Sequence, residues 1–127
     1  MEKLILDYSK WRCGVDGDNK LGEGDTALLN SEGYLCCLGQ FSLQLNKALT
    51  EKNIRGMGKP EEIGKEIPLL VQENYNYNKN SLFDETELTE FAIDINDDPT
   101  TSSEEKISQL KELFLKQNYE IEVINKP

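Results

Sequence analysis

The chain has 127 residues and a formal net charge of −10, with 37% hydrophobic and 30% charged residues. This length suits a single domain, 1–127, with its own core, and the excess of acid opposes direct binding to a nucleic-acid backbone. The sequence contains no histidine, which excludes Ser-His-Asp and Cys-His catalysis and histidine metal ligation.

The sequence also indicates the compartment. No run approaches the roughly 20 apolar residues of a membrane-spanning helix, and the only apolar run near the start is too short for a secretory signal. Three cysteines, two of them adjacent, predict reduced thiols. We therefore expect a cytoplasmic protein without a membrane partner.

The first part of the chain predicts strands and a loop. A short strand is expected over 3–7, and a glycine-rich loop over 14–25. Residues 26–30 and 34–37 flank Gly33, a spacing that predicts a hairpin in which this glycine takes a positive φ angle.

The middle of the chain predicts one main helix. It is expected over 37–49, with Gln40 and Gln44 facing away from its apolar side. Residues 50–60 form a connector, Pro60 opens a short helix, and 71–81 is expected to be an exposed loop. The apolar side of the main helix is formed by Leu38, Phe41, Leu45 and Leu49.

The last third predicts two helices and a strand. The first helix ends before Pro99, and the second begins with a capping box of Ser102 and Glu105 and reaches about Gln117. Residues 119–123 alternate strictly and predict a half-buried strand. The apolar stripes of the two helices are Leu88, Phe91, Ala92 and Ile95, then Ile107, Leu110, Leu113 and Phe114.

This order of elements predicts an α+β fold. A small antiparallel or mixed sheet, made of the N-terminal strand, the hairpin and the C-terminal strand, would pack against about three helices. The two terminal strands can pair with each other, but the sequence does not determine the strand order.

The adjacent Cys36 and Cys37 are candidate nucleophiles, because they lie near a predicted helix N-terminus, which favours a thiolate. The acidic chain and the missing histidine base oppose this. The alternative is that both cysteines pack in the core, as free cysteines commonly do. Together with Cys13 they supply only three thiolates, and adjacent cysteines are poor joint ligands, so neither zinc nor any other metal or cofactor is expected.

Two loops resemble ligand loops only in part. Residues 16–27 begin like an EF-hand loop, but Leu21 and Ala27 stand where a glycine and a glutamate are needed. Residues 22–26 are glycine-rich but lack the Gly-Lys-Ser/Thr ending of a phosphate loop. Neither loop is predicted to be a site.

A ligand site is a further possibility. Trp11 and Arg12 place an aromatic face beside a forked donor, which suits a nucleotide-like ligand, and Gln40 and Arg55 are candidate further contacts. The alternative is that Trp11 anchors the N-terminal strand while Arg12 lies on the surface.

The stretch from Asp84 to Glu105 contains nine acidic residues and no basic one. Solvated helix faces explain such a stretch, and a surface for a basic partner is the alternative. The candidate partner surface consists of Glu87, Glu90, Asp94, Asp97 and Asp98.

Several segments together resemble a pattern in small proteins of phages and prophages. The most specific is 36–40, Cys-Cys-Leu-Gly-Gln, and the others are 11–14, 28–33, 95–98 and the final helix and strand. The resemblance implies a small accessory protein in a bacterial cytoplasm. It implies no catalytic residue in this chain.

These observations predict a non-enzymatic binding protein, and the resemblance implies a phage-encoded accessory or anti-defence factor. It would sequester a nucleotide-like ligand or block a host protein, in the host cytoplasm. The alternatives are an enzyme that depends on Cys36 or Cys37, and a virion or assembly component. The sequence leaves the oligomeric state open.

Overall fold

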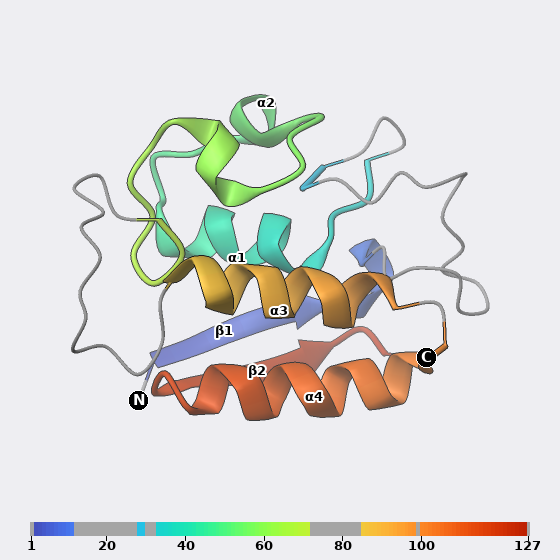
Figure 1. Ribbon diagram of the computed structural model, residues 1–127. Coiled ribbons are helices and arrows are strands. Elements are labelled where there is room, and N and C mark those ends of the chain that lie inside the picture. Colours follow the sequence, from blue (N-terminus) through green and yellow to red (C-terminus); the bar gives the residue numbers. More distant parts are fainter. Residues whose placement is uncertain (1, 12–27, 30–32, 72–84, 99, 127) are drawn as a thin grey trace.

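The computed structural model describes residues 2–11, 28–29, 33–71, 85–98 and 100–126. The described chain begins and ends with a strand, and helices lie between the two (Figure 1). The elements in chain order are β1 (Glu2–Asp7), η1 (Tyr8–Lys10), α1 (Cys37–Leu45), α2 (Glu51–Ile54), η2 (Pro60–Ile63), α3 (Glu85–Asp97), α4 (Ser103–Leu115) and β2 (Tyr119–Ile124).

The two terminal strands form a parallel sheet. In its register Leu4 lies opposite Ile121 and Leu6 opposite Val123. Leu4 and Leu6 are buried, whereas Lys3 is exposed, so the helices cover one face of the sheet. The α+β class is confirmed. Of the expected antiparallel or mixed sheet, the antiparallel option is not confirmed, because the helices between the two strands return the chain in the same direction.

The expected hairpin is not confirmed in the part of it that the structure describes. Leu29 forms a bridge with Arg55, whereas Leu35 forms one with Trp11. Gly33 has the expected positive φ of 91°, but residues 26–27 and 30–32 lie outside the described ranges. The two apolar arms therefore pair with different parts of the chain.

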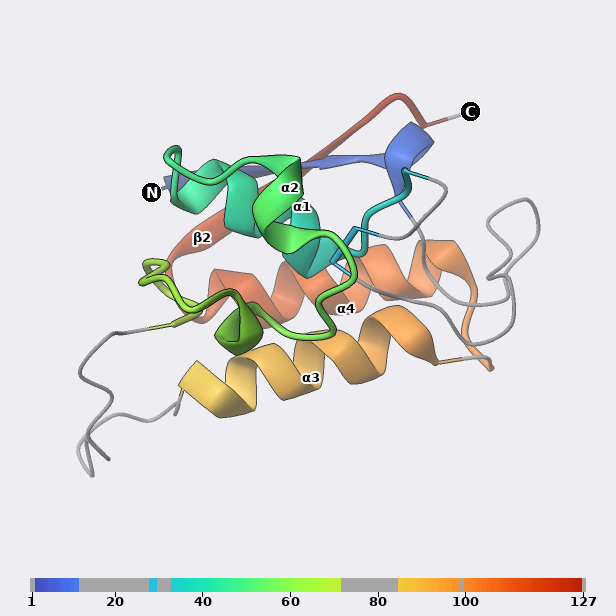
Figure 2. The same ribbon diagram turned by 90° about the horizontal axis from the view of Figure 1, so that it is seen from above.

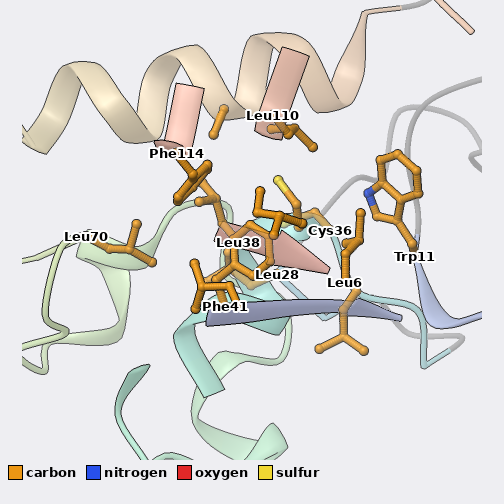
Figure 3. Packing of buried hydrophobic residues seen from close by; sticks show 14 of the residues in the cluster. Leu6, Trp11, Leu28, Cys36, Leu38, Phe41, Leu70, Leu110 and Phe114 are labelled. Atoms are coloured by element: carbon orange, nitrogen blue, oxygen red, sulfur yellow. The ribbon is translucent and has the colours of Figure 1, made fainter. Parts of the chain in front are cut away.

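The helices form a layer over the sheet. α1 packs against β1, α4 packs against β2, and α3 contacts both α1 and α4 (Figure 2). The side chains between them form one hydrophobic cluster (Figure 3). In this cluster the rings of Phe41 and Phe114 pack edge to face, with 5.1 Å between their centroids. No helix in the described ranges is both long and apolar enough to cross a membrane.

α1 is shorter than the sequence predicts, ending at Leu45 instead of Leu49. The backbone of Asn46 still donates to the carbonyl of Ser42, but its side chain accepts a hydrogen bond from the amide of Ala48 at 3.0 Å. Such a local side-chain bond competes with the next helical turn and ends the helix.

α4 follows its prediction closely. The hydroxyl of Ser102 caps it by accepting from the amide of Glu105 at 3.2 Å, and all four predicted apolar residues are buried. α3 departs from its prediction, because Phe91, which was expected in its apolar stripe, is 49% exposed. The buried side of α3 consists instead of Leu88, Thr89, Ala92 and Asn96.

Candidate functional site

The cysteine pair lies at the start of α1, inside the core. Cys36 is the N-cap, and its Sγ accepts a hydrogen bond from the amide of Gly39 at 3.4 Å. Burial raises the pKa of the Cys36 thiol to about 12, and the hydrogen bond from Gly39 offsets only part of that rise. Cys37 is fully buried. Cys36 is therefore a neutral thiol at physiological pH, unsuited to nucleophilic attack.

Gly39 explains why the helix packs so closely here. A Cβ at this position would lie 1.9 Å from the carbonyl oxygen of Leu28, which is backbone and cannot give way. The segment at Cys36 and Cys37 is thus a close contact between α1 and a neighbouring chain segment.

Trp11 is buried and its polar atom is used internally. The indole Nε1 donates to Oδ1 of Asn96 at 2.7 Å, and the same oxygen accepts from the amide of Cys37 at 3.2 Å. The indole ring also meets Tyr8 edge to face at 5.7 Å. Trp11 therefore anchors the N-terminal segment, as the alternative interpretation held, and offers no open face for stacking.

Asn96 was missed by the sequence analysis. It is 1% exposed, and its Nδ2 donates to Oδ1 of Asp97 at 2.9 Å. Its position four residues after Ala92 on α3 was the available signal, because a polar residue at helical spacing from a core residue needs a buried partner.

The other predicted ligand contacts are not gathered around Trp11. Arg55 is exposed at the end of α2, and Arg12 lies outside the described residues. The side chain of Gln40 is occupied by the backbone of β1. Within the described part of the chain, these residues do not form a nucleotide pocket.

Gln40 and Gln44 bind one edge of β1. Oε1 of Gln44 accepts from the amide of Ile5 at 2.7 Å, and its Nε2 donates to the carbonyl of Ile5 at 2.6 Å. Gln40 binds Asp7 in the same way, at 2.7 and 3.1 Å. Each glutamine amide therefore takes the place of a residue of a neighbouring strand.

The spacing of the two glutamines fits the strand. Residues i and i+4 of a helix are about 6 Å apart along its axis, and residues i and i+2 of a strand are about 6.6 Å apart. Two glutamines one turn apart can thus serve two alternate strand residues. α1 closes this edge of the sheet with side chains.

The other edge of the sheet, on β2, is open. Because Ile5 and Asp7 point their backbone groups towards α1, the alternate residues of β1 point theirs towards β2. In the observed register, Ile121 and Val123 then direct their N–H and C=O groups away from β1. No described residue pairs with those groups.

A groove of about 610 Å³ runs along this open edge, between β2 and α4. Ile107, Ile121 and Val123 form its apolar part. An ion pair between Lys126 and Glu104 joins the end of β2 to the start of α4. The groove thus combines an apolar strip with unpaired backbone donors and acceptors.

The predicted acidic partner surface is only partly open. Glu90 and Asp94 are exposed on α3, on either side of the exposed Phe91. The side chain of Glu87 is outside the described part. This surface stays a prediction.

The two acids at the end of α3 have local partners. Asp97 accepts the bond from Asn96 given above. Asp98 accepts from the amide and hydroxyl of Thr100, at 2.8 and 2.6 Å, and these bonds lower the pKa of its carboxyl group. Both side chains therefore shape the turn between α3 and α4.

The described residues contain no group of three cysteines, acids or histidines that could hold a metal ion. Cys13 and the two loops at 16–27 and 22–26 lie outside the described ranges. No family model, no curated protein and no solved structure matches the chain. The resemblance to phage and prophage proteins therefore stays a prediction.

Proposed function

We propose that the chain is a non-enzymatic binding protein that takes up an extended segment of another protein along the open edge of β2. The single observation that carries the proposal is this edge, where outward backbone groups border an apolar groove. An extended segment can add a strand to such an edge, with main-chain hydrogen bonds giving affinity and side-chain contacts giving specificity.

The contrast with β1 supports this function. Proteins commonly cover or charge the edges of their sheets, because an exposed edge pairs with other chains. Here α1 covers one edge with Gln40 and Gln44, while the groove beside β2 leaves the other accessible. Blocking a host protein, as a phage-encoded chain would do, is one form of this function.

A cysteine-dependent enzyme is the less favoured alternative. In a Cys13→Ser background, we expect Cys36 and Cys37 to resist iodoacetamide in the native chain at pH 7.5 and to react after unfolding in urea, because both thiols are buried. Mass spectrometry after timed labelling measures this. Rapid native labelling of Cys36 would restore the enzymatic alternative.

The test of the proposed function uses a proline at the edge. Val123→Pro removes an outward N–H that β1 does not use, so the sheet is retained. Val123→Ala is the matched control, because it removes the side chain and keeps the N–H. Both variants and the parent chain are used to sort a yeast-displayed library of random 12-residue peptides.

We expect Val123→Ala to weaken peptides selected on the parent chain only by the loss of its apolar contact, and Val123→Pro to bind them at least about tenfold more weakly than Val123→Ala, since at least one main-chain hydrogen bond is also lost in a desolvated setting. Selected peptides that bind Val123→Pro as well as the control would contradict the proposal. A library that yields no binder would contradict it too.

A further inference from the structure

The open edge of β2 has two chemically different sides. On the helix side, Ile121 is 4% exposed and Val123 is half-buried, and Ile107 of α4 lies next to them in the groove. Lys111 borders the same side. Since side chains of a strand alternate between faces, every second residue of an added strand would lie on this helix side. Apolar side chains fit there, whereas basic side chains would be repelled by Lys111.

The solvent side of β2 carries two glutamates, with Lys3 of β1 opposite Glu120 in the register. Glu120 and Glu122 are exposed there. Glu122 is 3.9 Å from Lys3, and both side chains are about half exposed, so this pair is weak. Glu120 forms no ion pair with a described residue. Opposite charges on adjacent strands stabilise a sheet, so this side favours basic residues.

A second copy of the chain fits this edge poorly. An antiparallel pairing of β2 with itself centred on Ile121 places Glu120 opposite Glu122, and one centred on Glu122 places that residue opposite itself. Like charges directly opposite each other destabilise a sheet. Each copy also carries a net charge of −10, which adds long-range repulsion.

Resting on the proposed function, we infer that the segment bound at β2 alternates apolar and basic residues. The apolar residues lie over Ile107, Ile121 and Val123. The basic residues lie on the solvent side, beside Glu120 and Glu122. The partner is therefore a protein with an exposed basic, alternating segment, and the acidic character of this chain increases its rate of encounter with such a partner.

The test compares three fluorescein-labelled ten-residue peptides by anisotropy at fixed ionic strength. One alternates valine and lysine, one alternates valine and glutamate, and the third has the composition of the first with all valines before all lysines. The chains are the parent, Val123→Pro, Val123→Ala and the exposed pair Glu120→Gln/Glu122→Gln.

We expect the alternating valine-lysine peptide to bind the parent at least about tenfold more tightly than either other peptide. The glutamate peptide turns two attractive cross-strand charge pairs into repulsive ones, and the block peptide cannot place its lysines and valines on opposite faces. Val123→Pro should weaken this peptide at least about tenfold relative to Val123→Ala. The double glutamine variant should lower the preference for lysine over glutamate to about threefold or less.

Each contrary result has its own meaning. If the glutamate peptide binds as tightly as the lysine peptide and both depend on the Val123 amide, the inferred chemistry is wrong and the proposed function stands. If lysine peptides bind all chains regardless of order or proline, the attraction is general charge, and both proposals fail. Dimers in analytical ultracentrifugation that Val123→Pro abolishes would identify a second copy as the occupant and overturn the inference.

Discussion

The two edges of the small sheet differ in whether their backbone groups are hydrogen-bonded. The edge of β1 is closed by two glutamine side chains from α1, which bind Ile5 and Asp7 as a neighbouring strand would. The edge of β2 lies beside α4, yet its outward backbone groups have no described partner. Both strands have a helix next to them, so proximity of a helix does not by itself close an edge.

The difference lies in the side chains that each helix presents. A glutamine amide both donates and accepts, so it can bind the N–H and C=O of one residue together. The α4 residues that line the groove are Glu104, Ile107, Ser108 and Lys111. A serine is too short to act in this way, and an isoleucine offers no polar atom. A lysine only donates and an ionised glutamate only accepts, and Glu104 is paired with Lys126.

The largest expected effect comes from opening the closed edge. Gln40→Ala/Gln44→Ala leaves backbone groups of Ile5 and Asp7 unpaired beside a helix, and we expect it to lower the free energy of unfolding by about 2–5 kcal/mol. Urea unfolding followed by circular dichroism measures this. Gln109→Ala, an exposed glutamine on α4, is the control and should change stability by less than about 0.5 kcal/mol. Equal losses in both variants would show that the edge contacts add nothing.

Proline substitutions compare the two edges directly. Ile5→Pro removes an amide that Gln44 binds, and we expect a loss of about 3 kcal/mol, whereas Val123→Pro should cost about 1 kcal/mol because its amide is unused. The same urea experiment measures both. If the two prolines cost the same, the edges do not differ in pairing.

Hydrogen exchange can show the contrast in the unchanged chain. We expect the amides of Ile5 and Asp7 to exchange at least about a hundredfold more slowly than those of Ile121 and Val123, after correction for sequence, because only the first two are hydrogen-bonded. Residue-resolved NMR measures the four rates. Similar protection at all four amides would mean that the edge of β2 is covered in solution.

The smallest effect concerns the carboxyl ends of the two strands. The Asp7 carboxylate accepts from Ser9 and from Nδ2 of Asn125, which follows β2, and these bonds lower its pKa. A carboxyl group with a lowered pKa in the folded state stabilises the fold above its unfolded pKa, and this stability is lost as the pH falls through the folded value.

We therefore expect Asp7→Asn to reduce stability at pH 7 by less than about 1 kcal/mol, because this group is largely solvated. The difference from the parent chain should shrink as the pH falls below about 4. Thermal unfolding at a series of pH values measures it. A difference that grows in acid would have the wrong sign for this explanation.

Local patterns predicted much of the fold. The strands at both ends, α4 with its buried residues, and the start of α1 at Cys37 follow from alternation, helical spacing and capping within short windows. The hairpin around Gly33 was inferred from the same kind of signal and was not confirmed, because Leu29 and Leu35 pair with residues distant in sequence.

The site was harder to predict for the same reason. Gln40 was interpreted as a ligand contact, but its amide binds Asp7, 33 positions away. Phe91 was predicted to be in the core because it is aromatic and correctly spaced, but Thr89 and Asn96 are the buried residues. Asn96 is buried because it accepts a hydrogen bond from Trp11, 85 positions away. The open edge of β2 depends on strand order, which no local window contains.

The parallel pairing of β1 with β2 has a consequence for synthesis on the ribosome. β1 leaves the exit tunnel long before β2, so a long loop must close before they pair. Gln40 and Gln44 emerge much earlier and can bind β1 while translation continues. Until β2 has been synthesised, one edge of β1 is therefore covered by α1 and only the other edge is exposed. This limits premature association with neighbouring nascent chains.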